Sequence, residues 1–151
     1  MSEPDPVFTV VREWIAKAEN DLKTAVIALR AGAMCPTDTT CFHAQQCVEK
    51  YLKAFLACEG IAFPKTHNIR VLMELIPRQS RPSLDRTWQD RLTDYATSAR
   101  YPGWDDISLG EARKAVAVAR RVRREVRGLM PRAATVRKRA TPSKTSTRNA
   151  R

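Results

Sequence analysis

Residues 108–129 read SLGEARKAVAVARRVRREVRGL, and their apolar positions recur every three or four residues. Because an α-helix completes a turn in about 3.6 residues, this spacing places the apolar side chains on one face. Ser108 and Glu111 have the spacing of a capping box, in which each side chain hydrogen-bonds the free backbone N–H of the other. The segment therefore predicts a long amphipathic helix that begins at Ser108.

Two further long helices are expected upstream. The first covers residues 11–31 and ends at Gly32, because glycine tolerates the left-handed backbone that closes many helices. The second follows three candidate N-cap residues at positions 38–40 and continues to Gly60.

Two shorter helices complete the pattern. One is capped by Thr66 or Asn68 and ends before Pro77, and the other covers residues 84–98 and ends before the helix-breaking pair at residues 102–103. No segment alternates apolar and polar residues as a strand does. The sequence therefore predicts an all-α fold, an antiparallel up-and-down helical bundle of four main helices plus a short extra helix.

The bundle is expected over residues 7–131, followed by a basic disordered tail over residues 132–151. The tail has seven basic residues, no acidic residue and almost no apolar side chain to bury. It supplies seven units of the formal net charge of +11, which leaves +4 for residues 1–131. An argument for polyanion binding from net charge thus rests mainly on the tail.

The sequence also indicates the compartment. No run approaches the roughly 20 apolar residues of a membrane span, and the acidic first six residues do not resemble a signal peptide. The four cysteines lie between residues 35 and 58 without a CxxC pair, which is typical of free thiols. We therefore expect a cytoplasmic protein with no membrane contact, no bound metal and no cofactor.

Common catalytic motifs are absent from the sequence, which has no Gly-rich phosphate loop, no GxSxG and no HExxH. The two histidines, His43 and His67, are expected to serve in packing or capping rather than in metal binding. The second long helix carries a polar band that predicts either a solvated face or the lining of a pocket. The band consists of Gln45, Gln46, Glu49, Lys50 and Lys53.

Residues 99–106, ARYPGWDD, place an arginine, two aromatic residues and two acids in a connection between helices. Loops held by rigid helices often carry binding residues. Arg100 could clamp a phosphate with its planar set of donors, and Tyr101 or Trp104 could stack on a base. The alternative is an ion pair between Arg100 and one of the two acids, Asp105 or Asp106.

Several blocks of the sequence stand out together: Trp14, Ala18, Asp21, Leu22 and Ala25; CFHAQQCVEKYLKAFL at residues 41–56; Lys65-Thr66-His67; Ala99-Arg100-Tyr101-Pro102; and Glu111-Ala112. In this order and spacing they resemble the HEPN domain family, whose name abbreviates higher eukaryotes and prokaryotes nucleotide-binding. The resemblance covers about residues 10–130 and is closest to the variant with an Ala-Arg-Tyr-Pro segment. Its most specific part is the AQQxxEKxLKA pattern at residues 44–54.

The resemblance implies a homodimer that binds a nucleotide or a nucleic-acid phosphate. It also implies a small nucleotidyltransferase as partner, with which this chain would form a complex or a toxin and antitoxin pair. The polar site is expected at residues matched to the family blocks, namely Lys65, His67, Arg100 and Tyr101, with Lys50 and Lys53 as further candidates.

The alternative function is an RNA-cleaving toxin of a HEPN/nucleotidyltransferase toxin–antitoxin pair, with Arg100 as the catalytic phosphate clamp. Ribonucleases of the family carry a histidine a few residues after this arginine, which acts as acid or base. Here residues 105–107 read Asp-Asp-Ile, and no histidine follows His67. An aspartate does not readily replace imidazole near neutral pH. Ribonuclease activity therefore stays open at this level, as does a purely structural dimer.

Overall fold

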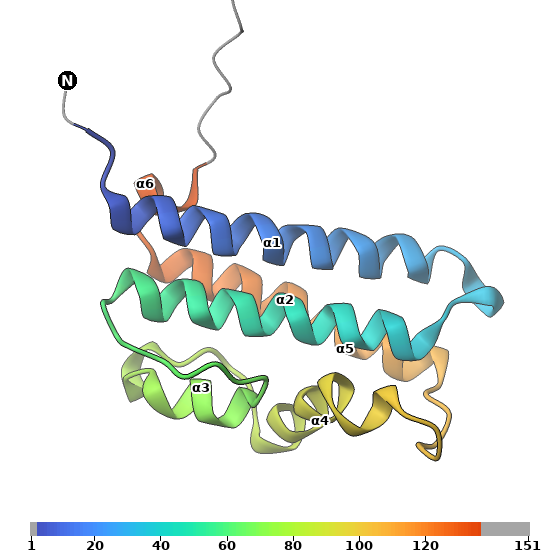
Figure 1. Cartoon of the computed structure of the whole chain (residues 1–151). Helices are drawn as coiled ribbons and strands as arrows, with labels where there is room; N and C mark the ends of the chain where they lie inside the picture. The colour runs from blue at the N-terminus through green and yellow to red at the C-terminus, as the bar shows by residue number, and fades with distance from the viewer. Residues whose placement is uncertain (1–2, 137–151) are drawn as a thin grey trace, which may run out of the picture.

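The apolar stripes expected from the sequence are buried between helices in the computed structural model, which describes residues 3–136 (Figure 1). The main helices alternate in direction and are α1 (Pro6–Leu29), α2 (Thr37–Cys58), α4 (Arg86–Ala96) and α5 (Leu109–Leu129). The shorter helices are α3 (Ile69–Leu75) and α6 (Arg132–Thr135), and 3-10 turns lie at Gly32–Met34, Arg78–Ser80 and Ser98–Arg100. No strand occurs within the described residues, and the all-α prediction is confirmed.

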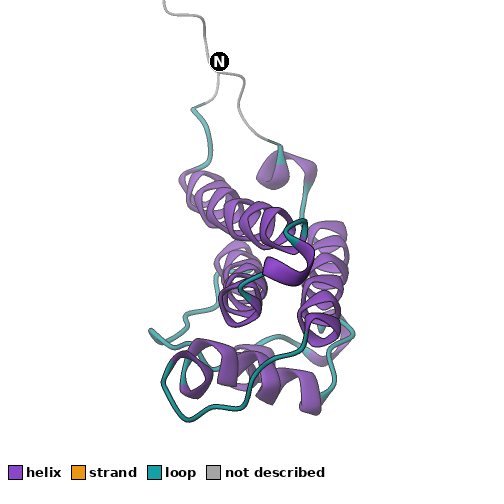
Figure 2. Cartoon of the chain, turned by 90° about the vertical axis from the view of Figure 1, so that its right-hand side faces the viewer, coloured by secondary structure: helices purple, strands orange, loops and turns teal. Residues whose placement is uncertain are grey.

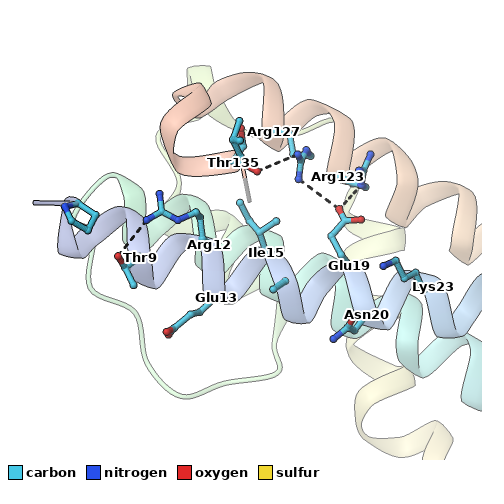
Figure 3. A pocket seen from close by; sticks show the side chains of 13 residues that line it. Thr9, Arg12, Glu13, Ile15, Glu19, Asn20, Lys23, Arg123, Arg127 and Thr135 are labelled. Carbon is cyan, nitrogen blue, oxygen red and sulfur yellow. Dashed lines mark hydrogen bonds and ion pairs between the residues drawn. The ribbon is translucent and has the colours of Figure 1, made fainter. Parts of the chain in front are cut away.

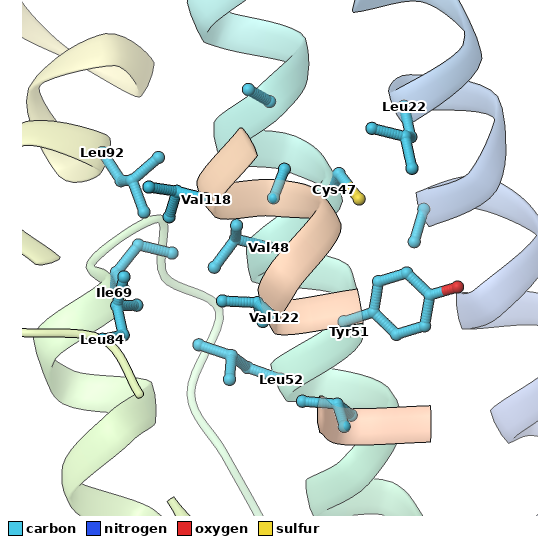
Figure 4. Close-up of a cluster of buried hydrophobic side chains, with 14 of the residues drawn as sticks. Leu22, Cys47, Val48, Tyr51, Leu52, Ile69, Leu84, Leu92, Val118 and Val122 are labelled. Atoms are coloured by element: carbon cyan, nitrogen blue, oxygen red, sulfur yellow. The ribbon is translucent and has the colours of Figure 1, made fainter. Parts of the chain in front are cut away.

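Helix α2 lies at the centre of the bundle. It packs beside α5, with α1 on one side of this pair and the α3–α4 segment on the opposite side (Figure 2). Apolar side chains from these layers meet around Val48 and Leu52 of α2 (Figure 4). Full burial of one such leucine stabilises the fold by about 1.5–3 kcal/mol. The partners of this core include Leu22 of α1, Ile69 of α3, Leu92 of α4 and Val122 of α5.

Several helix ends follow the expected signals, whereas α1 begins at Pro6 rather than at residue 11, with Asp5 as its cap. Gly32 and Gly60 have positive φ values of 56° and 67° after α1 and α2, and Asn68 caps α3 by accepting two backbone N–H groups. The start of α2 differs from the prediction. This helix begins at Thr37 without a side-chain cap, so the expected cap residues at positions 38–40 lie inside its first turn.

The expected capping box at α5 is half formed. Ser108 Oγ accepts a hydrogen bond from the backbone N–H of Glu111 at 3.0 Å. The Glu111 carboxylate is instead bonded to the Arg91 guanidinium, at 2.6 Å from Nε, so it ties α5 to α4. Helix α4 also begins later than the expected range 84–98, because the Asp85 side chain caps it by accepting a hydrogen bond from the Trp88 N–H, and it ends at Ala96.

Folded structure extends beyond Pro131, where the sequence predicted that it ends. Residues 132–135 form α6, in which Ala134 is fully buried. Arg12 of α1 donates a hydrogen bond to the Ala133 carbonyl oxygen at 2.7 Å. Residues 132–136 therefore belong to the folded part, and the rest of the predicted tail, residues 137–151, lies outside the described residues.

Candidate functional site

The polar band of α2 is largely buried, although the sequence predicted a solvated face or a pocket lining. The exposed fractions of Gln45, Glu49 and Lys53 are 0%, 3% and 7%. Trp14 of α1 covers one side, with its ring centre 5.5 Å from Lys53 Nζ. His67, in the loop between α2 and α3, contacts Glu49 from another side. A band that looks like a solvent-facing surface in the sequence is thus an internal polar network.

Glu49 is the centre of this network. Its carboxylate accepts hydrogen bonds from Lys53 Nζ at 2.7 Å and Gln45 Nε2 at 2.8 Å, and it lies 3.0 Å from His67 Nδ1. Burial on its own raises the pKa of Glu49, but the hydrogen bonds from Lys53, Gln45 and His67 outweigh burial and lower the pKa below its ordinary value. Glu49 and Lys53, four residues apart on α2, form an ion pair. Lys53 and His67 are therefore already engaged with a carboxylate.

A second polar cluster joins α1 to α2. Asp21 of α1 is 8% exposed, and its two carboxylate oxygens lie 2.8 Å from His43 Nδ1 and 2.5 Å from Lys50 Nζ. His43 thus packs against a carboxylate that lies far away in the sequence. Lys50, a candidate phosphate ligand, is used here as the partner of Asp21.

Arg100 lies at the end of the 3-10 turn Ser98–Arg100 and is exposed. Its guanidinium carbon is 4.4 Å from the ring centre of Phe42 in α2, so the cation lies over the aromatic face. Within residues 3–136 Arg100 forms no ion pair, and the alternative of pairing with Asp105 or Asp106 is not observed. The Phe42 ring fixes the guanidinium while its N–H donors stay available to a ligand.

Arg100 borders a surface cavity of about 480 Å³ between residues 35–38 and residues 99–107. Tyr101, which is 70% exposed, lines the same cavity. The cavity also contains three carboxylates, from Asp38, Asp105 and Asp106. A bare polyphosphate would be repelled by these acids, whereas the hydroxyl and amino groups of a nucleotide can donate hydrogen bonds to them.

The loop that carries Arg100 is anchored to the helices behind it. The Arg91 guanidinium carbon is 5.7 Å from the ring centre of Trp104, and the same guanidinium is bonded to Glu111 of α5. Gly103 turns the loop with a φ of 97°, a backbone conformation that favours glycine. These contacts position the cavity rim.

The six residues predicted as a site fall into separate places. Lys53 and His67 meet at Glu49, Lys50 lies at Asp21, and Arg100 and Tyr101 border the cavity. Lys65 is exposed in the loop between α2 and α3. The six residues predicted from the sequence therefore belong to two polar clusters and to the exposed surface. They do not form one pocket.

Sequence reasoning did not assign roles to Asp21 or Phe42. A signal for Asp21 was present, because position 21 lies one turn from Ala18 and from Ala25 on the apolar stripe of α1. An acid on a buried face requires a partner. No comparable signal pointed to Phe42, since its contact with Arg100 spans much of the chain.

Residues 3–136 lack two further classes of feature. None of the helices there combines the length and apolar character that crossing a bilayer requires. The same residues contain no cluster of three or more His, Cys, Asp or Glu side chains arranged to hold a metal ion.

Comparison with known proteins gives one family and one similar structure. The chain matches the HEPN domain over residues 11–129. Its fold is similar to the crystal structure of an archaeal HEPN homologue, with 25% sequence identity and a TM-score of 0.60. The alignment covers 80% of this chain and 98% of that chain. No curated protein matches the chain at a significant level.

Proposed function

The chain belongs to the HEPN domain family, and from this premise we propose that it binds a nucleotide, or the phosphate of a nucleic acid, at the surface around Arg100. It does so as a homodimer and as the partner subunit of a small nucleotidyltransferase. The observation that carries the proposal is the position of Arg100, an exposed cation fixed on the face of Phe42 beside the exposed ring of Tyr101.

This arrangement suits the two chemically different ends of a nucleotide. The guanidinium has planar donors that match two phosphate oxygens at once. An exposed tyrosine ring offers a surface on which a base can stack. The carboxylates of Asp105 and Asp106 accept hydrogen bonds from ribose or base donors. The mixed charge of the cavity therefore favours a nucleotide over inorganic polyphosphate.

The remaining candidate residues have different roles in this proposal. Lys50 and Lys53 are paired with Asp21 and Glu49, so they act in these ion pairs rather than in contact with phosphate. Lys65 and His67 lie in the loop after α2, and the His67 side chain is 61% exposed. They would reach only a ligand that extends beyond the cavity.

Thermal unfolding with and without nucleotide tests the proposal. A ligand at about 100 times its Kd stabilises the fold by about 2.7 kcal/mol, which raises Tm by roughly 5–10 °C in a domain of this size. Arg100→Ala should abolish the shift. Arg86→Ala, which removes an exposed cation at the start of α4, should leave it intact. Absence of a shift with adenine and guanine nucleotides at millimolar concentration would contradict nucleotide binding.

The proposed assembly has its own tests. Light scattering on the purified chain should give twice the mass of 17.1 kDa. Co-expression with a nucleotidyltransferase encoded beside this chain should yield a complex that survives purification. A monomeric chain that fails to bind such a partner would contradict the proposed assembly without contradicting nucleotide binding.

The alternative, an RNA-cleaving toxin, is favoured by the position of His43. Its ring centre is 5.4 Å from that of Phe42, the ring that Arg100 covers, and Asp21 holds its Nδ1 atom. His43 and Arg100 thus contact the same Phe42 ring, although no histidine follows Arg100 in the sequence. Induced expression should then arrest growth and cleave RNA, and both effects should require Arg100 and His43. Normal growth with intact RNA would contradict the toxin and would be consistent with a nucleotide-binding partner subunit.

A further inference from the structure

The positive charge of the bundle is concentrated on one helix. Residues 1–108 contain thirteen basic and fourteen acidic residues, whereas α5 contains seven basic and two acidic residues. The net charge of +4 for residues 1–131 therefore comes from α5. Four of its cations are exposed, namely Arg113, Lys114, Arg120 and Arg124.

Helices α1 and α5 border a groove that ends at α6 (Figure 3). A cavity of about 830 Å³ lies near α6, and a second hollow of about 560 Å³ shares Glu19, Arg123 and Arg127 with it, so the two are continuous. We call this surface the α1–α5 groove and define it by its six cations: Arg12, Lys23, Arg120, Arg123, Arg124 and Arg127.

Glu19 organises the middle of the groove. Its carboxylate accepts a hydrogen bond from Arg123 Nε at 2.5 Å, and Arg127 Nη1 lies 3.7 Å away (Figure 3). The carboxylate also accepts a hydrogen bond from the hydroxyl of Tyr51. Burial alone raises the pKa of Glu19, but the hydrogen bonds from Arg123 and Tyr51 lower it below its ordinary value. Glu19 therefore stays charged and holds both arginines in place while balancing only part of their charge.

The other cations of the groove have no such compensation. Arg12 donates to the Ala133 carbonyl and to the Thr9 hydroxyl, which are neutral acceptors. Within residues 3–136 no ion pair involves Lys23, Arg120 or Arg124. The lining contains one further acid, the exposed Glu13. The groove thus presents a surplus of positive charge to solvent.

The size and composition of the groove indicate the class of its ligand. Arg120 and Arg127 are separated by about 10 Å along α5, and further cations face them from α1, so a single phosphate would use only part of the surface. Arginine binds phosphate oxygens in pairs. Val136 also lines the groove, and the sequence adds six more cations after it without an acid. An extended polyanion matches this distribution.

The lining contains no aromatic residue. Proteins that bind single strands without sequence preference use aromatic side chains on which bases stack. A duplex hides its bases and presents phosphates, which is what this groove can contact. We propose that the α1–α5 groove binds the phosphate backbone of base-paired nucleic acid. The groove shares no residue with the Arg100 surface, and this binding goes beyond the function proposed above.

Fluorescence anisotropy with a labelled RNA duplex tests the assignment, using full-length protein over a range of salt concentrations. Arg120→Gln combined with Arg124→Gln should reduce the magnitude of the negative slope of log K against log salt by about two, where K is the association constant. Binding should weaken at least about tenfold. The matched control, Arg78→Gln with Arg86→Gln, removes two exposed cations away from the groove and should bind as the unaltered chain does. Circular dichroism confirms that each variant is folded.

Any one of several results would overturn the proposal. They are an equal loss in the control pair; unchanged binding in the groove pair; tighter binding of the single strand than of the duplex; and equal competition by poly-glutamate, which would assign the groove to an acidic protein. A full-length variant with Arg137→Gln, Lys138→Gln and Arg139→Gln tests the contribution of the tail cations to duplex binding. If only this variant binds the duplex more weakly, the tail and not the groove is the binding surface. Nucleotide stabilisation should persist in the groove pair, so failure at Arg100 and failure at the groove are distinguishable.

Discussion

Replacing Glu49 by glutamine should destabilise the protein strongly, because it leaves a buried ammonium without its carboxylate. The side chains of Glu49 and Lys53 are 4% and 8% exposed, and Lys53 Nζ lies 2.7 Å from Glu49 Oε1. Removing one partner of a buried ion pair costs about 3–5 kcal/mol. That is a large share of the roughly 5–15 kcal/mol by which such domains are stable. We expect Tm to fall by roughly 6–20 °C.

Urea unfolding followed by far-ultraviolet circular dichroism measures this loss. The midpoint should fall while the dependence of the free energy on urea stays unchanged. Glu59→Gln, at an exposed acid just after α2, is the control and should change the free energy of unfolding by less than about 0.5 kcal/mol. Glu49→Leu with Lys53→Met removes both charges and should recover part of the loss, because the buried Gln45 amide still loses its acceptor. A cost below about 1 kcal/mol for Glu49→Gln, or no recovery in the double variant, would show that an uncompensated buried charge is not the source of the loss.

Three further predictions concern other parts of the chain. Asp21→Asn weakens the link from α1 to His43 and Lys50, and equilibrium unfolding should show a loss of about 1–3 kcal/mol. The pKa values of Glu19 and Glu49 in the folded protein lie below the ordinary 4.5. The stability that these two carboxylates contribute is therefore present above about pH 4.5 and is lost as pH falls through their folded pKa values. The urea concentration at the midpoint of unfolding should decline as pH is lowered through this range. Gly103→Ala should cost about 1 kcal/mol because φ is 97°, whereas Gly128→Ala, in open space near the end of α5, should gain up to about 1 kcal/mol; calorimetry that gave both changes the same sign would contradict this account.

The helices could be predicted from the sequence because their signals are local. The stripe of α5 and the glycines after α1 and α2 each depend on residues within one or two turns. The extent of folded chain after Pro131 was not predictable in this way. Residues 132–135 contain little apolar surface, and their order depends on the Arg12 side chain, which comes from the other end of the sequence.

The polar clusters show the same division between local and distant information. The pairing of Glu49 with Lys53 follows from their separation of four residues on a helix. Its burial does not, because the covering groups are Trp14 of α1 and His67 of a loop. Likewise, Arg100 was recognisable as a candidate from its own segment, but its position over Phe42 is set by how α4 packs on α2.

The packing of α6 on α1 brings the two ends of the described chain together (Figure 1). A short Gly/Ser linker could therefore join residue 136 to residue 5 at small entropic cost, since loop closure depends only weakly on length. New ends opened between Gln79 and Ser80, in an exposed turn, would keep all six helices intact. A circularly permuted chain of this kind would omit residues 1–4 and 137–151, so that the new linker would be the only addition at the end of the bundle beside α6.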